Sequence, residues 1–191
     1  MKFAYDEGKA GEMAAFLLNW GDDPMGQMKL IKLLYIADRQ AIVETGFSIT
    51  GDQIYGMEKG PVLSVTLNLI KGLQRGRGKV ASYVAPVSEK QYVRSVQHPP
   101  DAPELLSDYE LRVLRRVHDE FGNHTGEQLK DWLHQNAPEW KEPNTPGGRA
   151  LIDPADILAA EGWSPEAIAA IAAEADYYYG IEPSTGRTAS A

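Results

Sequence analysis

The chain has 191 residues, 43% of them hydrophobic, and a formal net charge of −8, so it can bury a substantial core as one domain. It contains no cysteine, which excludes disulfides, thiolate zinc sites and a cysteine nucleophile. The sequence shows neither a run of apolar residues of membrane-spanning length nor a secretory signal pattern, so we expect a cytoplasmic protein.

The first part of the chain is predicted to contain three helices and one short strand. Apolar spacing predicts a helix over residues 9–20 and a central helix over 26–44 that stops at Gly46. Residues 49–57 then form a short strand. Pro61 stands where a third helix can begin, because proline is tolerated at the first helical position, and this helix would run to about Gly72.

A basic glycine loop separates these elements from two antiparallel strands predicted over 80–86 and 90–97. The proline-rich segment 98–104 then breaks the chain. Capping boxes predict one helix over 108–121 and another from Thr125 to Asn136, followed by a loop over 138–149. An Asp-Pro pair at Asp153 and a Ser-Pro pair at Ser164 predict two short helices that end near residue 179. The predicted fold class is α+β, predominantly α-helical, with a small antiparallel β element.

The central helix places one carboxylate among apolar side chains. In "MKLIKLLYIADRQ", residues 28–40, Asp38 falls inside the apolar arc of the helix. We expect Asp38 to be at least partly buried and structural, because an unpartnered buried carboxylate is too costly to keep. The expected partners are backbone N–H groups near residues 60–63, Lys59 or His134. The alternative is a general base with a raised pKa.

No arrangement of residues supports catalysis, a metal or a cofactor. The four histidines lack metal-ligand spacing, and no HExxH motif is present. The basic glycine loop lacks the spacing of a phosphate loop and follows a helix instead of a strand. No serine has an adjacent base and orienting group. The sequence therefore predicts no enzyme activity, no metal and no cofactor.

The charge is distributed unevenly along the chain. Residues 1–103 carry a net charge of +1 and residues 104–191 a net charge of −9, which disfavours nucleic acid and is compatible with a basic protein partner. The alternative is a DNA-binding regulator, because the element order over 26–97 resembles a winged helix-turn-helix. Its basic loop would supply Lys71, Arg75, Arg77 and Lys79.

Three short motifs, taken in order, resemble the Panacea domain of SocA-like antitoxins, which are often described as phage-associated proteins. The motifs are Lys32-Leu33-Leu34-Tyr35, then Gly60-Pro61-Val62, then Leu129 with His134 and Trp140. The similarity covers roughly residues 12–145. It implies a Panacea domain over 1–150, followed by a helical extension over 151–180. Residues 181–191 are predicted to be a mobile tail that is dispensable for folding.

The resemblance implies a non-enzymatic antitoxin that binds a cognate toxin encoded by an adjacent gene. For SocA-like members it also implies an adaptor that presents the toxin to a AAA+ protease. Lys59, Arg75 and Arg77 are predicted to contact the partner, and Tyr177 to Tyr179 either join that interface or dock the last helix. The motif residues predicted to be structural are Lys32, Tyr35, Asp38, Gly60, Pro61, His134 and Trp140.

Overall fold

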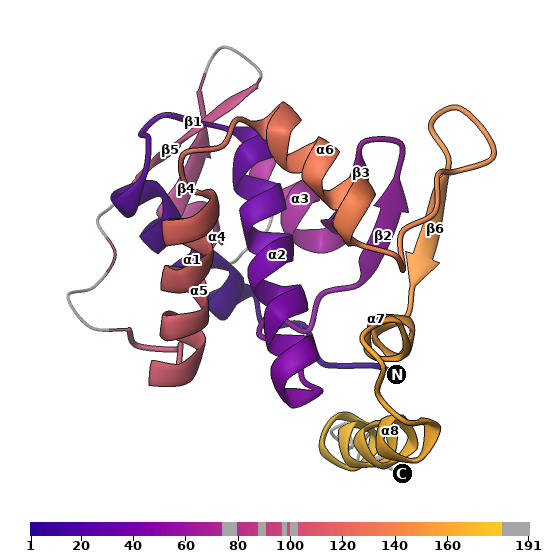
Figure 1. Cartoon of the computed structure of the whole chain (residues 1–191). Helices are drawn as coiled ribbons and strands as arrows, with labels where there is room; N and C mark the ends of the chain where they lie inside the picture. The colour runs from indigo at the N-terminus through magenta and orange to yellow at the C-terminus, as the bar shows by residue number, and fades with distance from the viewer. Residues whose placement is uncertain (74–79, 88–90, 97–98, 100–102, 181–191) are drawn as a thin grey trace, which may run out of the picture.

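A computed structural model describes residues 1–73, 80–87, 91–96, 99 and 103–180. The fold is α+β and mainly helical, as the sequence predicted (Figure 1). The predicted tail, residues 181–191, lies outside the described residues. The elements in chain order are α1 Glu7–Trp20, β1 Met25–Gly26, α2 Gln27–Thr45, β2 Ile54–Met57, β3 Gly60–Leu63, α3 Ser64–Ile70, α4 Val80–Tyr83, β4 Val84–Pro86, β5 Tyr92–Ser95, α5 Asp108–Phe121, α6 Gly126–Asn136, β6 Arg149–Ile152, α7 Pro154–Ala160 and α8 Pro165–Tyr179.

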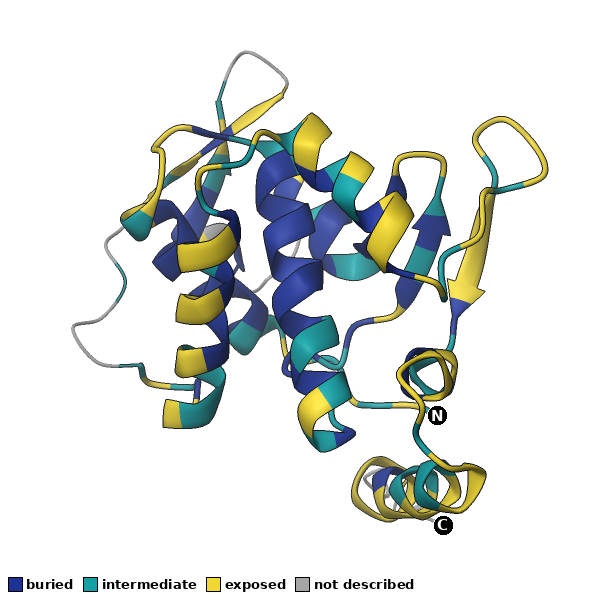
Figure 2. Cartoon of the chain, in the orientation of Figure 1, coloured by how far each residue is buried: buried dark blue, intermediate teal, exposed yellow. Residues whose placement is uncertain are grey.

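The central element is α2, and helices α1, α3, α5 and α6 pack around it (Figure 1). Every residue from Lys29 to Asp38 is buried, including the charged ones. Figure 2 shows this helix as buried along most of its length, whereas α5 and α6 are exposed on their outer faces. The helix ends at Gly46, which adopts a left-handed conformation with φ 84° that glycine tolerates best.

Two small antiparallel sheets flank the helices. One has the strand order β1-β5-β4 and the other the order β3-β2-β6. Strands β2 and β3 form a tight hairpin in which Met57 lies opposite Gly60, so that Glu58 and Lys59 form its turn. Among the described helices, none is long and apolar enough to cross a membrane.

The prediction that a helix begins at Pro61 is wrong, because Pro61 lies in β3 opposite Gly56. Helix α3 begins only at Ser64, and the reason is a carboxylate that precedes it by a dozen residues. Asp52 accepts hydrogen bonds from the backbone N–H groups of Val65 and Thr66 at 3.0 and 2.8 Å. These contacts cap the helix from outside, so its start is set by where Asp52 lies.

Two further predictions about strands require correction. Residues 80–83 form the helical turn α4 instead of a strand, because Val80 and Tyr83 have helical spacing and both are buried. Strand β6 begins at Arg149, the last residue of the predicted loop, and pairs with β2. The predicted domain boundary at residue 150 therefore falls inside a strand.

The helices of the second half were predicted closely. The capping boxes at Ser107 and Thr125 are both present, and α5 and α6 end at the predicted residues. Helices α7 and α8 begin after Asp153 and Ser164. These boundaries were predictable because a capping box acts within one turn of the helix it begins.

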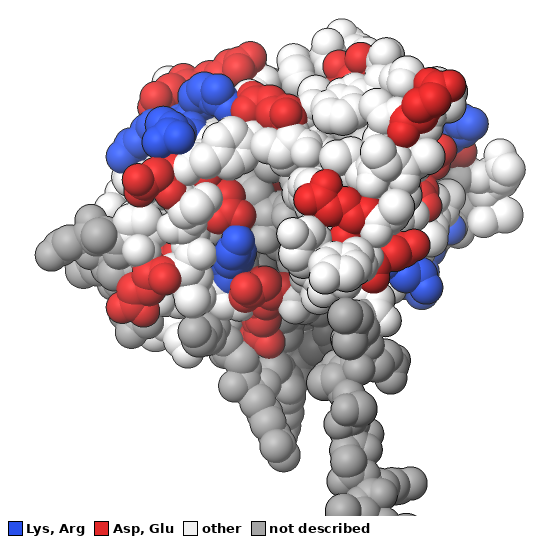
Figure 3. Space-filling view, turned by 90° about the horizontal axis from the view of Figure 1, so that it is seen from below, with Lys and Arg blue, Asp and Glu red and all other residues white. Residues whose placement is uncertain are grey.

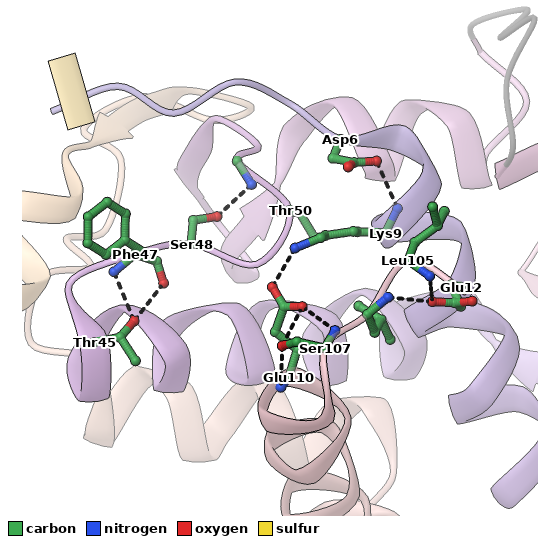
Figure 4. A network of polar contacts seen from close by, with 12 residues as sticks. Asp6, Lys9, Glu12, Thr45, Phe47, Ser48, Thr50, Leu105, Ser107 and Glu110 are labelled. Atoms are coloured by element: carbon green, nitrogen blue, oxygen red, sulfur yellow. Dashed lines mark hydrogen bonds and ion pairs between the residues drawn. The ribbon is translucent and has the colours of Figure 1, made fainter. Parts of the chain in front are cut away.

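Buried polar contacts join α1 to the segment that precedes α5 (Figure 4). Glu12 is fully buried, and its carboxylate accepts hydrogen bonds from the backbone N–H groups of Glu104, Leu105 and Leu106 at 2.7, 3.1 and 2.8 Å. Lys9 donates to Glu110 at 2.6 Å. The role of Glu12 was not predicted from the sequence, because its partners lie 92 to 94 residues away.

Candidate functional site

The three motif residues of α2 are buried and contact three different segments. Lys32, Tyr35 and Asp38 follow one another at intervals of three, and each interval turns the side chain by about 60° around the helix axis. Lys32 donates to the carbonyl of Pro61 at 2.8 Å, and Tyr35 donates to Glu139. The helix therefore holds the β2–β3 hairpin and the segment after α6 in fixed positions.

The motif residues of α6 and the following loop lie against the same hairpin. Trp140 donates its indole N–H to the carbonyl of Met57 at 2.9 Å, and His134 stacks on Trp140 with ring centroids 4.0 Å apart. A Cβ atom added at Gly60 would lie 3.1 Å from the Lys32 amino group and 3.4 Å from His134 Cδ2. We call Lys32, Gly60, Pro61, His134 and Trp140 the motif cluster.

The motif cluster has an unusual electrostatic character. Lys32 is 1% exposed, and burial lowers the pKa of its amino group to about 7. Burial, and next the positive charge of Lys32, lower the pKa of His134 below its usual range. Of the described carboxylates, none forms an ion pair with Lys32. The cluster thus contains a buried amino group without an anionic partner, and near pH 7 only part of the molecules carry its positive charge.

A second polar network was not predicted from the sequence. Arg39 donates to both oxygens of Glu139 at 2.7 and 3.0 Å and also to Glu161 at 2.7 Å. Burial by itself would raise the pKa of Glu139, but the hydrogen bonds from Arg39 and Tyr35 outweigh it and lower that pKa. The charge of Arg39 on α2 was visible in the sequence, but its partners are 100 and 122 residues away.

Asp38 is fully buried and partnered, which confirms the prediction of burial. Its predicted partners near residues 60–63 are wrong. The carboxylate accepts hydrogen bonds from the Ser48 hydroxyl and the Thr50 backbone N–H, each at 2.8 Å. The chain reverses at Gly46, so residues 48–50 run back beside Asp38, while the hairpin reaches only the Lys32 end of α2.

An open groove lies beside the motif cluster. It has a volume of about 720 Å³, and we call it the lysine groove. Lys59, a predicted partner-binding residue, is exposed at the hairpin turn and lines it. Arg75 and Arg77, the other two, lie outside the described residues. Its lining includes Met28, Lys29, Ile31, Lys32, Met57, Glu58, Lys59, Val62, Leu67, Lys71, Tyr92, Gly126 and Glu127.

Other predicted features lie apart from the lysine groove. His118 on α5 packs against Trp20, whereas His134 on α6 packs against Trp140. Within the described part of the chain, no group of three or more His, Cys, Asp or Glu side chains is placed to hold a metal ion. Three of the seven residues of α3 are buried and the other four, including Asn68, are partly buried, so a recognition helix at this position would offer few fully exposed side chains to DNA.

The last helix leaves aromatic side chains in solvent. Tyr177 and Tyr178 are 70% and 63% exposed, and Tyr179 contacts Phe3 with ring centroids 5.9 Å apart. Of the two alternatives for these tyrosines, docking of the helix therefore applies to Tyr179 alone.

Figure 3 shows that carboxylates outnumber basic side chains on the face of the molecule seen from below.

Comparison with known protein families assigns the chain to one of them. A family model described as "Antitoxin SocA-like, Panacea domain" matches residues 30–141, which is more than half of the chain. The chain therefore belongs to the SocA-like antitoxin family with a Panacea domain, as its motifs indicated. This membership supports an antitoxin role. No curated protein and no solved structure matches the chain.

Proposed function

We propose that this protein neutralises a protein toxin, encoded by an adjacent gene, by binding it directly and without altering it covalently. The observation that carries the proposal is the family match over residues 30–141, which includes every residue of the motif cluster. The family description names an antitoxin role. Direct binding is the simplest mechanism for a chain in which the described side chains form no recognisable catalytic arrangement.

The geometry of the motif cluster is consistent with a scaffold role. Its residues are engaged with one another around the hairpin, which leaves the neighbouring exposed residues to meet a partner. Lys59 is exposed at the hairpin turn, only one residue from Gly60. Substitutions of Gly60, Pro61, His134 and Trp140 should therefore act through stability, whereas substitutions of exposed residues beside the cluster should act on binding.

Co-expression of each neighbouring gene with and without this one tests the proposal. We expect one neighbour to arrest growth, and this protein to restore growth and to co-purify with that neighbour. The intact mass of the co-purified toxin should equal the mass calculated from its sequence. The proposal fails if no neighbour is both toxic and bound. Rescue with a covalently modified toxin would instead indicate an enzyme.

We further propose that this protein presents the bound toxin to a AAA+ protease, a role that rests on the family resemblance alone. The half-life of the toxin should then shorten when this protein is present and should recover in a strain that lacks the protease. If the toxin is equally long-lived in both strains while growth is still rescued, the adaptor role fails and neutralisation by binding remains.

A further inference from the structure

The lysine groove lies where two helices begin and a hairpin turns. The first turns of α2 and α6 contribute Met28, Lys29, Gly126 and Glu127, and the hairpin turn contributes Lys59. Figure 1 places the beginnings of both helices and the turn of β2–β3 at the same end of the molecule. Backbone N–H groups point out of the start of each helix, so this end of the protein carries partial positive charge.

The beginning of α2 has no side-chain cap, whereas the beginning of α6 has one. Gly26 is the N-cap residue of α2 and has no side chain that could cap the helix. The N–H group of Gln27 is satisfied by the carbonyl of Gln91, and Met28 and Lys29, which come next, line the groove. Thr125, in contrast, caps α6 in a capping box. The first turn of α2 therefore has no side-chain cap, and α6 packs against it, because a Cβ added at Gly126 would lie 3.1 Å from the backbone nitrogen of Lys29.

The charges that line the groove do not cancel. Lys29 is paired with Asp22, and Glu127 is paired with Lys130 outside the lining. Three lysines, at positions 32, 59 and 71, then line the groove beside Glu58, and the charge of Lys59 also acts on Glu127. None of these three lysines forms an ion pair with a described carboxylate. A positively charged groove on a chain with a net charge of −8 is a local feature that the overall composition does not explain.

Lys32 is the least expected of the three cations. It is 1% exposed, and its single hydrogen bond goes to the neutral carbonyl of Pro61. A buried ammonium group usually has a carboxylate partner, because desolvation of an unpaired charge is costly. Its place in the groove lining means that an anion entering the groove would supply the missing partner.

The remaining lining contains the polar residues Gln27, Gln91 and Thr125 and a larger set of apolar side chains, and the apolar set favours some anionic ligands over others. The side chains involved are Met28, Ile31, Met57, Val62, Leu67 and Tyr92. Methionine is flexible and polarizable and is common at surfaces that accept varied peptide side chains. A nucleic-acid strand would demand a longer basic track with stacking aromatic residues, and the acidic charge of the whole chain would oppose it. The lining thus favours a peptide that has both acidic and apolar residues.

We propose that the lysine groove binds an acidic peptide segment of the partner protein, with one carboxylate beside Lys32 and with apolar side chains on Met28 and Met57. That the partner is the toxin rests on the proposed function. The binding of the segment itself does not. Lys59 and Lys71 attract the acidic segment, and Lys32 provides its buried contact.

The test uses the full chain and synthetic overlapping peptides that cover the products of the adjacent genes. The test variant is K59E with K71E, since both residues are exposed and their replacement should leave the fold unchanged. The matched control is K2E with K141E, which alters two exposed lysines outside the groove and gives the same net charge. Thermal unfolding of both variants verifies that they fold.

We expect acidic peptides from one neighbour to bind the unaltered protein and the control equally, and to bind the test variant at least about tenfold more weakly. K32M, which keeps the aliphatic stem and removes the charge, should weaken binding similarly, and glutamine in place of the glutamates of the peptide should do the same. The proposal is overturned if no peptide binds, or if binding is equal in the test variant and the control. A duplex DNA probe that binds only through Lys59 and Lys71, while the peptides do not, would also overturn it and assign the groove to nucleic acid.

The results can distinguish failure of the groove proposal from failure of the proposed function. A peptide that depends on the lysines but comes from a non-toxic neighbour would retain the groove as a peptide site and refute the antitoxin mechanism. Rescue and complex formation that survive in the K59E/K71E variant would retain the antitoxin mechanism and refute the groove.

Discussion

Asp38 is a buried carboxylate whose two hydrogen bonds do not fully offset the loss of water. Burial raises the pKa of its side chain from 3.8 to about 6, against the lowering effect of the bonds from Thr50 and Ser48. The carboxylate of Asp38 therefore binds a proton more tightly in the folded state than in the unfolded chain. The resulting stabilisation is complete below pH 3.8 and is lost as the pH rises through about 6.

Replacement of Asp38 by asparagine should remove this pH dependence. Between pH 4 and 7, the free energy of unfolding of Asp38→Asn should rise relative to the unaltered protein by up to about 3 kcal/mol. Urea unfolding at several pH values measures the difference. Asp176→Asn, at an exposed site on α8, is the control and should show no such trend. A constant difference across this range would contradict the assignment.

Gly60 combines a backbone requirement with a close approach to the motif cluster. Its φ of +90° disfavours any side chain, and an added Cβ would press on Lys32 and His134. Gly162 has φ +82° but nothing within 4 Å of an added Cβ. Gly60→Ala should therefore lower the free energy of unfolding by about 1 kcal/mol more than Gly162→Ala, as measured by chemical denaturation. Equal losses of unfolding free energy in the two variants would mean that the motif cluster rearranges around the added methyl group without an energetic penalty.

At the scale of elements, single buried carboxylates join segments that are distant in sequence. Asp52 sets the start of α3, and Glu12 joins α1 to the segment before α5. Each carboxylate accepts several backbone N–H groups that would otherwise be buried without partners. A short loop or helix thus takes its position from one acidic side chain of another element.

Glu12→Gln should be strongly destabilising although it changes few atoms. The amide nitrogen cannot accept a hydrogen bond, so at least one N–H group among residues 104–106 would lose its acceptor. We expect a loss of about 2–4 kcal/mol in the free energy of unfolding. Glu120→Gln, an exposed change on α5, should cost less than about 0.5 kcal/mol. If the two variants unfold alike, the carboxylate of Glu12 does not hold this segment.

Helix α8 should tolerate changes at its exposed tyrosines. The paired change Tyr177→Ala and Tyr178→Ala should alter stability by less than about 1 kcal/mol, because both side chains lie in solvent. Tyr179→Ala should cost more, since its ring contacts Phe3. Thermal unfolding distinguishes the two. A large loss in the paired variant would show that these tyrosines stabilise the fold after all.

At the scale of the whole molecule, acidic charge and a local basic groove coexist. The sequence pI of about 5.0 and the carboxylates seen in Figure 3 disfavour a polyanion as partner. The lysine groove occupies a restricted area at the end of the molecule where α2 and α6 begin. Under our proposal the groove recognises one short acidic segment, and we expect the surrounding carboxylates to weaken the binding of extended polyanions.

Duplex DNA provides a direct test of this charge argument. At physiological salt we expect no association with the protein's own promoter that is tighter than the micromolar, non-specific range. Gel mobility shifts at several salt concentrations measure it, and Arg75→Ala with Arg77→Ala tests the contribution of the basic loop. A nanomolar complex that weakens steeply with salt would favour the DNA-binding alternative.

The sequence by itself determined the features that depend on neighbouring residues. Capping boxes set the starts of α5 and α6, apolar periodicity predicted α2, and the pattern around Asp38 predicted that this carboxylate is buried. Three motifs in order were enough to indicate the family. Each of these signals acts within a few residues along the chain, where helical geometry is known in advance.

Only the tertiary structure decided which distant groups meet. Pro61 joins a strand instead of beginning a helix because Asp52 caps α3 at Val65 and Thr66, and β6 forms because β2 offers it an edge. Asp38 bonds to residues 48–50 because the chain reverses at Gly46, while Lys32 turns to the hairpin and leaves its charge unpaired. These outcomes depend on hydrogen bonds between segments tens of residues apart, whose relative positions no local pattern specifies.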